Sequence, residues 1–177
     1  MNKLENDTIT LRAPEPEDLE ILYKWENDTS LWQVGITIAP FSRHILKKYI
    51  ETAHLDIFET KQLRFMIGTR SGETIGAIDL FDFDPLNRRA GIGVLIAAEE
   101  QRRKGYASSA LTLLISYCFG ILALHQVYCS IDSSNTSSIV LFEKHGFVRC
   151  GVRKDWNLRN NSWEDEILYQ LINADRS

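Results

Sequence analysis

Residues 94–119 constrain the fold of this chain more than any other stretch. They open with the apolar run Val94, Leu95 and Ile96, which is too short for a helix and long enough for a buried strand. A charged turn follows and ends at Gly105, after which apolar residues recur from Ala107 with the period of an amphipathic helix. The stretch predicts a strand, a glycine-bearing turn and a helix over residues 107–119 that ends with Gly120 at its C′ position.

Such a junction is typical of an anion site, phosphate above all. The first amides of a helix have no partner within it, and the helix dipole is positive at that end. Gly105 allows a ligand close to the backbone, and the small residues Ala107 and Ser108 leave the first turn uncrowded. Arg102, Arg103 and Lys104 add positive charge. The residues alone also fit an ordinary strand–helix connection with a solvated charge cluster.

Two segments resemble one protein family. Residues 102–107 fit the pattern Arg/Gln-x-x-Gly-x-Gly/Ala, which resembles the acetyl-CoA pyrophosphate loop of the GNAT superfamily of N-acyltransferases. Residues 135–147 are similar to the family's segment Asn-x-x-Ser-Ile-x-Leu-Tyr-Glu-Lys-x-Gly-Phe. The two segments cover the C-terminal half of the chain, and the element order of the remainder also fits.

Composition excludes several other classes of protein. With 177 residues, of which 44% are hydrophobic, the chain is expected to form a single domain over residues 1–177. A net charge of −4 argues against a nucleic-acid partner. No run reaches transmembrane length and the first residues carry no apolar signal segment, so we expect a cytoplasmic protein without a membrane partner. Cys118, Cys129 and Cys150 are odd in number and lack metal-type spacing, so we expect no metal, and the two that sit in apolar stretches are expected to be reduced core residues.

Hydrophobic periods and turn residues outside the central stretch predict the other elements. A helix is expected after Pro16, and Ser42 is expected to cap a second helix with apolar positions to Ile57. A third helix is expected to enter at Asn135 and to end at Gly146. The predicted strands are residues 8–12, 63–69, 73–82, 88–96, 126–131, 147–157 and 163–172, the last two closed by residues 158–162. This order favours an α/β (α+β) fold with a mixed sheet.

The GNAT resemblance implies both the fold and the cofactor. It implies a mixed central sheet of about seven strands, helices on both faces, and a V-shaped splay between the fourth and fifth strands. Acetyl-CoA would lie in that splay as co-substrate. Backbone groups of Val94, Leu95 and Ile96 would bind the pantetheine arm. The other residues implied to bind the cofactor are Arg102, Arg103, Lys104, Gly105, Tyr106, Ala107, Ser108, Asn135 and Lys144. For Lys144, a solvated surface lysine is the alternative.

Catalysis is where the chain departs from the family pattern. An alkyl amine with a pKa of about 10.4 is only about 0.1% neutral at neutral pH, so a base is needed. Relatives often carry a glutamate at the position of Gly91 and a proton-donating tyrosine at the position of Phe142. The remaining candidate bases are Asp79 and Asp82. Strict alternation puts them on opposite faces of the sheet, so at most one points into the cleft without a bulge. A charge at a solvated sheet end is the alternative.

The sequence therefore favours an acetyl-CoA-dependent N-acetyltransferase that acts on a primary amine. The acceptor stays open between a polyamine, a peptide N-terminus, an aminoglycoside and another small amine. Within the family, residues 79–82 and 88–90 and the N-terminal organisation resemble the spermidine acetyltransferases, and the ribosomal-protein N-terminal acetyltransferases are also similar. The resemblance implies acidic residues in the loop of the spermidine enzymes that corresponds to residues 34–40; this chain has none there, which weakens the polyamine assignment. A CoA-binding regulatory or assembly module with lost catalysis and a plain structural domain are the alternatives. A homo-oligomer is possible, with a dimer preferred: residues 163–172 either pair with a second copy or complete the sheet of their own chain.

Overall fold

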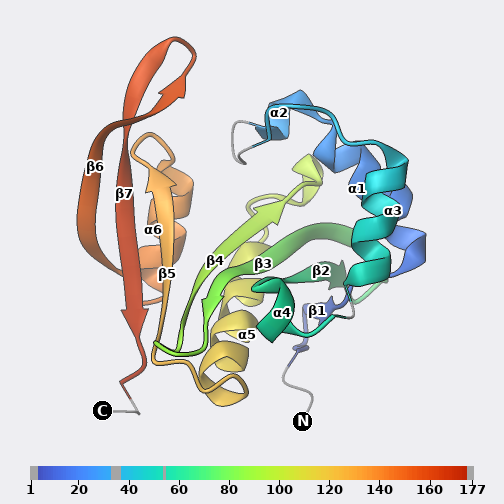
Figure 1. The fold of residues 1–177 in the computed structure, drawn as a ribbon, viewed down its shortest axis with the longest axis horizontal. Helices are drawn as coiled ribbons and strands as arrows, with labels where there is room; N and C mark the ends of the chain where they lie inside the picture. Colours follow the sequence, from blue (N-terminus) through green and yellow to red (C-terminus); the bar gives the residue numbers. More distant parts are fainter. Residues whose placement is uncertain (1–3, 33–36, 54, 175–177) are drawn as a thin grey trace.

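The computed structural model describes residues 4–32, 37–53 and 55–174. Its strands form one sheet in the order β1-β2-β3-β4-β5-β7-β6, in which β4 and β5 are parallel and all other neighbours antiparallel (Figure 1). The seven-stranded mixed sheet that the sequence predicts is thus confirmed. The strands are β1 (Ile9–Arg12), β2 (Leu63–Thr69), β3 (Thr74–Asp84), β4 (Arg89–Ile96), β5 (Gln126–Asp132), β6 (Val148–Arg159) and β7 (Ser162–Ile172).

Helices cover both faces of the sheet. On one face α5 packs against β1, β3, β4 and β5 (Figure 1). On the other face, the helices α1 and α3 bury Leu22 and Ile50 against Met66 of β2. Burial of these apolar faces orients the sheet, because each strand exposes alternate residues to opposite sides. The helices are η1 (Pro16–Asp18), α1 (Leu19–Glu26), α2 (Thr29–Trp32), α3 (Arg43–Thr52), α4 (Ile57–Thr60), η2 (Glu99–Gln101), α5 (Tyr106–Gly120) and α6 (Thr136–Lys144).

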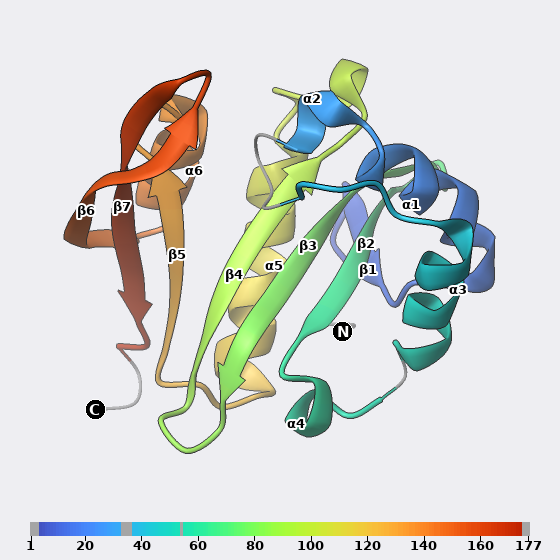
Figure 2. The ribbon, with the colours of Figure 1, turned by 45° about the horizontal axis from the view of Figure 1, so that its top comes forward.

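The sheet splays open between β4 and β5. The two strands pair only at Arg89–Gln126, Ala90–Val127 and Gly91–Tyr128. Beyond Gly91 they diverge, while β5 stays paired with β7 as far as Asp132 (Figures 1 and 2). Along the rest of β4, the edge that faces β5 therefore has no strand partner in the described residues, and the expected V-shaped splay is confirmed.

Two predicted helix ends are wrong. The helix capped by Ser42 ends at Thr52 rather than reaching Ile57. The side chain of Asp56 accepts a hydrogen bond from Phe58 N and so starts a separate turn, α4. At the end of α5, Gly120 is still helical and Ala123, with φ +54°, takes the left-handed conformation instead. Apolar spacing continues through both breaks, which is why it misplaces them.

The cysteines are free thiols, as the sequence predicts. Cys118 of α5 and Cys129 of β5 are buried between helix and sheet, whereas Cys150 of β6 is exposed. Burial raises the pKa of the Cys118 and Cys129 thiols to about 12. Among the described residues, no helix is long and apolar enough to cross a bilayer.

Candidate active site

Gly105 places the start of α5 at the mouth of the splay. It is the N-cap of α5 with φ +86°, a left-handed conformation that glycine adopts without strain. A Cβ atom built there meets nothing within 4 Å. In the part of the chain that the structure describes, the backbone N–H groups of residues 103–108 have no protein acceptor. Open space beside a row of free amides at a helix N-terminus fits a diphosphate.

The basic side chains of residues 102–104 differ in the hydrogen bonds that hold them to the protein. Arg102 donates from Nε to the carbonyl oxygen of Ile96 at 2.9 Å and so ties the loop to the end of β4. Lys104 Nζ donates to Gln101 Oε1 at 2.9 Å. Arg103 has φ +62°, which turns the chain before Gly105. Arg102 thus holds the shape of the loop, with its guanidinium bound to the carbonyl oxygens of Ile96 and Ala97.

Helix α6 brings one predicted cofactor residue to the same place and holds the other far away. His145, next to Lys144, has Nε2 at 3.1 Å from the carbonyl oxygen of Ser108 in the first turn of α5. Lys144 itself is exposed at this end of α6. Asn135 caps the opposite end of α6, about 14 Å along the helix axis, where its side chain accepts from Ser138 N at 3.1 Å.

A bulge in β3 changes the expected geometry of the two aspartates. The register with β4 shifts between Phe81 and Asp84, and Asp82 has φ +49°. The carboxylate of Asp82 thereby lies on the same face as Phe81. Tyr128 shows this, because its ring packs edge-on against Phe81 and its hydroxyl lies 3.5 Å from Asp82 Oδ2. Strict alternation is therefore wrong here, and Asp79, Phe81 and Asp82 share the face opposite α5.

Tyr128 stands at the branch point of the splay. It is the last residue of β5 that pairs with β4, opposite Gly91. Burial, with a contribution from the carboxylate of Asp82, raises the pKa of Tyr128. The phenol is consequently protonated at neutral pH and can act as a proton donor.

The structure gives a steric reason for Gly91 and shows how Phe142 packs. A Cβ atom on Gly91 would lie 2.2 Å from Cε2 of Phe81, so the Phe81 ring fills the space that a glutamate at position 91 would need. Phe142 is buried and packs edge-on against Phe147 with ring centroids 5.0 Å apart. The only tyrosine at the splay branch point in the described residues is Tyr128.

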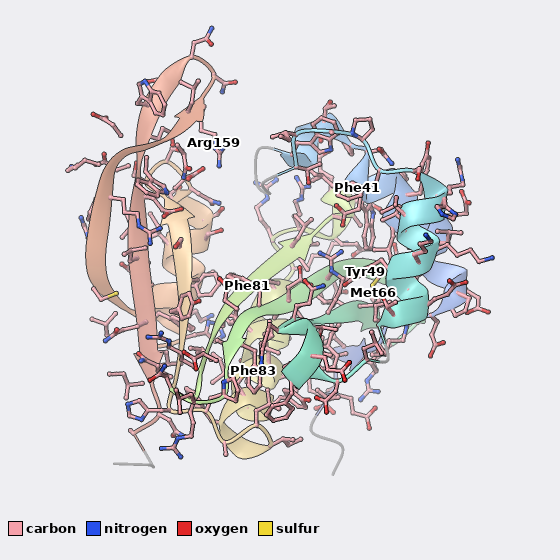
Figure 3. All side chains as sticks on the ribbon, viewed as in Figure 1. Phe41, Tyr49, Met66, Phe81, Phe83 and Arg159 are labelled. Carbon is pink, nitrogen blue, oxygen red and sulfur yellow. The ribbon has the colours of Figure 1, made fainter. Side chains whose placement is uncertain are left out.

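A pocket of about 360 Å³ opens beside the aspartates on the face opposite α5. Figure 3 shows Phe41 and Tyr49 on the α3 side, with Phe81 between them and β5. The walls are mostly apolar or aromatic, and the charged lining residues are Glu26, Arg64 and Asp79. The full lining is Glu26, Phe41, Ile45, Leu46, Tyr49, Gln62, Leu63, Arg64, Asp79, Leu80 and Phe81. Its size suits a small molecule or a single side chain.

Arg64 binds both carboxylates of this pocket. Its Nε and Nη2 donate to the two oxygens of Asp79 at 2.7 and 2.8 Å, and its Nη1 donates to Glu26 Oε1 at 2.8 Å. Burial of the guanidinium lowers the pKa of Arg64, but the hydrogen bonds and charge of Asp79 outweigh burial, so that the pKa is raised. This bidentate pair makes Asp79 a structural partner of Arg64.

Sequence reasoning did not find Arg64, Tyr128 or the role of Phe81. Arg64 and Asp79 lie opposite each other across β2 and β3, so the hairpin register contained a usable signal. Nothing local signalled Tyr128, because the β4–β5 pairing joins residues far apart in sequence. Within the described residues, no three His, Cys, Asp or Glu side chains are grouped as metal ligands.

A parallel strand pair that splays beside an uncapped helix start, with a pocket on the opposite face, is the arrangement that the GNAT resemblance implies for an acetyltransferase. The chain belongs to the acetyltransferase (GNAT) domain family, whose model matches residues 8–148. The resemblance seen in the sequence and the activity it implies, acetyl transfer to an amine, are confirmed.

Individual relatives agree with this family. The spermidine N(1)-acetyltransferase of Vibrio cholerae serotype O1 is 26% identical over 160 residues, 90% of each protein. The putative ribosomal N-acetyltransferase YdaF of Bacillus subtilis is 31% identical, over 94% of this chain and 92% of its own. A crystal structure of the Vibrio cholerae spermidine enzyme with CoA and spermine matches with a TM-score of 0.83 at 25% identity, covering 94% of this chain and 96% of that one.

Proposed function

We propose that this protein transfers the acetyl group of acetyl-CoA directly to a primary amine that enters from the face opposite α5. The observation that carries the proposal is the junction of the β4–β5 splay with the uncapped start of α5 at Gly105. Acetyl-CoA supplies an activated thioester. The pocket beside Asp79 and Phe81 then takes the acceptor.

The proposed donor site uses backbone more than side chains. The free amides of residues 103–108 bind the diphosphate, with Lys144 beside them. The unpaired edge of Val94, Leu95 and Ile96 binds the pantetheine arm, since sheet edges offer vacant donors and acceptors. Arg102 holds the loop to β4. Asn135 holds the start of α6, and its contact with the donor remains a prediction.

Proton transfer is assigned to Asp82 and Tyr128. Asp82 is exposed at the bulge and accepts the proton that the ammonium loses, directly or through a water. Tyr128 lies at the branch point with its phenol protonated, so it donates to the leaving thiolate. Asp79 was the other candidate base, but the bidentate contact with Arg64 suits it to shaping the pocket.

Relatives suggest several acceptors and an oligomer. Similar proteins are named for spermidine, ribosomal and aminoglycoside acetylation. One solved relative is a dodecameric spermidine N-acetyltransferase with a TM-score of 0.78. Because β7 is paired with β5 on one side and with β6 on the other, residues 163–172 complete the chain's own sheet and offer no free edge to a second copy. We propose a homo-oligomer that uses side chains of the β6–β7 hairpin, where Trp156, Leu158 and Trp163 are exposed. The cytoplasmic location and the single domain over residues 1–177 stay predictions.

A CoA-binding module without catalysis is the second candidate. It is favoured by Phe142, which is buried and has no hydroxyl at the position where relatives have a proton donor.

Steady-state release of free CoA thiol with a panel of primary amines tests the proposal. The Cys150→Ser variant serves as the enzyme, because the exposed thiol of Cys150 would react with the thiol reagent. Turnover with at least one amine, with the acetylated product seen by mass spectrometry, supports the enzyme. CoA binding without turnover on any amine supports the module, and absence of CoA binding contradicts both.

A further inference from the structure

We propose that the natural acceptor is a primary monoamine carrying an apolar or aromatic body, rather than a polyamine. This inference rests on the proposed function and concerns the pocket beside Asp79. Its evidence is the composition of the pocket wall, the pairing of the pocket charges and the apolar character of the rim.

The pocket wall offers an acceptor mostly apolar contacts. Seven of its residues are Phe41, Ile45, Leu46, Leu63, Leu80, Phe81 and Tyr49. Burial raises the pKa of Tyr49, so its phenol stays neutral and adds aromatic surface to the wall. An alkyl or aryl group in this pocket leaves water, which favours binding in proportion to the apolar area buried.

The rim of the pocket is also apolar. Phe41, Ile45 and Phe81 line the pocket and remain 36%, 49% and 36% exposed. Ile38, in the segment that precedes Phe41, is 91% exposed. These side chains present no carboxylate to a cation that approaches, and residues 37–40 contain none.

The pocket has few unpaired negative charges with which to bind a polycation. Glu26 and Asp79 are the carboxylates of the lining, and Arg64 directs three hydrogen bonds at them. Two carboxylates with one guanidinium leave a single net negative charge, which suits one ammonium group. Asp82 lies outside the lining and is the proposed base for the reacting amine. Spermidine has three amino groups, so it brings more ammonium groups than the pocket and Asp82 have unpaired negative charges, and the excess would have to leave water without a partner.

A comparison of amines by kcat/KM for CoA thiol release tests the wild-type preference. The probes are propylamine, hexylamine, 2-phenylethylamine, spermidine and the peptide amide Leu-Ala-Ala. We expect hexylamine and 2-phenylethylamine to exceed propylamine about tenfold or more, because their added carbons are buried. Both should also exceed spermidine. Spermidine as the best substrate would overturn the inference and leave the acetyltransferase intact. If the peptide amide has the highest kcat/KM, the acceptor is a peptide N-terminus with an apolar side chain. If hexylamine has the highest kcat/KM, the acceptor is a small apolar amine.

A carboxylate introduced at the rim of the pocket tests whether the lack of negative charge there disfavours spermidine. Ile45→Glu places a carboxylate at a half-exposed rim position and should raise the ratio of spermidine to hexylamine kcat/KM several-fold. Ile121→Glu is the matched control, since Ile121 is 52% exposed at the end of α5 outside the pocket lining. An equal ratio in the two variants would contradict the proposed charge balance.

The Arg64→Gln variant tests whether the ion pairs of Arg64 with Glu26 and Asp79 keep these carboxylates from binding a polyamine. It frees Glu26 and Asp79 for a dication and should move the preference toward spermidine. If this variant fails to fold, the Ile45→Glu result stands without it.

Binding separates this inference from the proposed function. If no amine is acetylated, the proposed function fails, and the CoA-loaded protein is titrated calorimetrically with hexylamine and spermidine. Tighter binding of hexylamine would still support an apolar acceptor pocket. Tighter binding of spermidine, or no binding of either amine, would overturn it.

Discussion

At the scale of single residues, the backbone of Asp82 decides the use of its carboxylate. With φ +49° the residue lies in the left-handed region, which costs most side chains about 1–2 kcal/mol and which aspartate tolerates better. The resulting bulge brings the carboxylate to the face where Tyr128 and Phe81 lie. The carboxylate of Asp79, three residues earlier, instead accepts hydrogen bonds from Arg64.

These two aspartates should respond differently to the same substitution. Asp82→Asn removes the proposed base, so we expect kcat to fall about 10²–10⁴-fold with little change in Tm. Asp79→Asn leaves Arg64 without its bidentate partner and should lower the free energy of unfolding by about 1–3 kcal/mol. Steady-state kinetics and urea unfolding of both variants check this. Similar small losses of kcat in the two variants would remove Asp82 from the mechanism.

A second residue-scale prediction concerns Gly105. Gly105→Glu sets a negative charge beside the free amides, and we expect the Kd for CoA to rise by about two orders of magnitude. Gly72→Glu is the matched control, because Gly72 has φ +89° in the β2–β3 turn and the same open space for a Cβ atom. Both variants should lose similar stability, since both force a side chain into the left-handed region. Calorimetric titration with CoA that gives the same Kd for both would contradict the phosphate assignment.

At the scale of elements, β3 and β4 pack closely where Gly91 of β4 lies beside the ring of Phe81 of β3. Gly91→Ala would place Cβ at 2.2 Å from the Phe81 ring, and we expect it to cost about 1–3 kcal/mol of unfolding free energy. The double variant Gly91→Ala with Phe81→Ala should recover most of that loss, because the colliding ring is gone. Urea unfolding of the two single variants and the double variant forms the test cycle. Additive losses in the cycle would mean that Phe81 is not the colliding group.

Local signals predicted the elements well where one pattern dominates. The β2 strand was predicted at its observed bounds, and the Ser42 cap and the left-handed Gly146 are as expected. The errors fall where apolar spacing runs through a break, as at Ile57. Strict alternation does not predict the bulge at Asp82, because it assumes that every residue of a strand is paired with the neighbouring strand.

At the scale of the whole molecule, the two parts of the candidate site differ in how they are encoded. The donor loop around Gly105 is a run of consecutive residues, so a sequence motif reveals it. The acceptor pocket joins Glu26 of α1, Tyr49 of α3, Arg64 of β2 and Asp79 of β3. Only the packing of α1 and α3 on the sheet brings these residues together, and no local pattern records that packing.

The buried thiols give a global prediction for stability against pH. Burial raises the pKa of Cys118 and Cys129 from the ordinary value of 9.0 to about 12. Above pH 9.0 the unfolded chain loses these protons while the folded chain keeps them. Stability is therefore fully present below that pH and falls as pH rises toward about 12, by about 1.4 kcal/mol per pH unit for each thiol.

Variants isolate this contribution from other groups that titrate in the same range. Replacing Cys118 and Cys129 with alanine together should lower the stability at neutral pH, because two buried sulfur atoms are lost, and should flatten the alkaline decline. Cys150→Ser removes an exposed thiol and should leave the decline unchanged. Urea unfolding across the alkaline range measures the three slopes. If the double variant loses stability with pH as steeply as the native chain, the two thiols titrate alike in the folded and unfolded states, and the tight packing of α5 on β5 inferred from their burial does not hold.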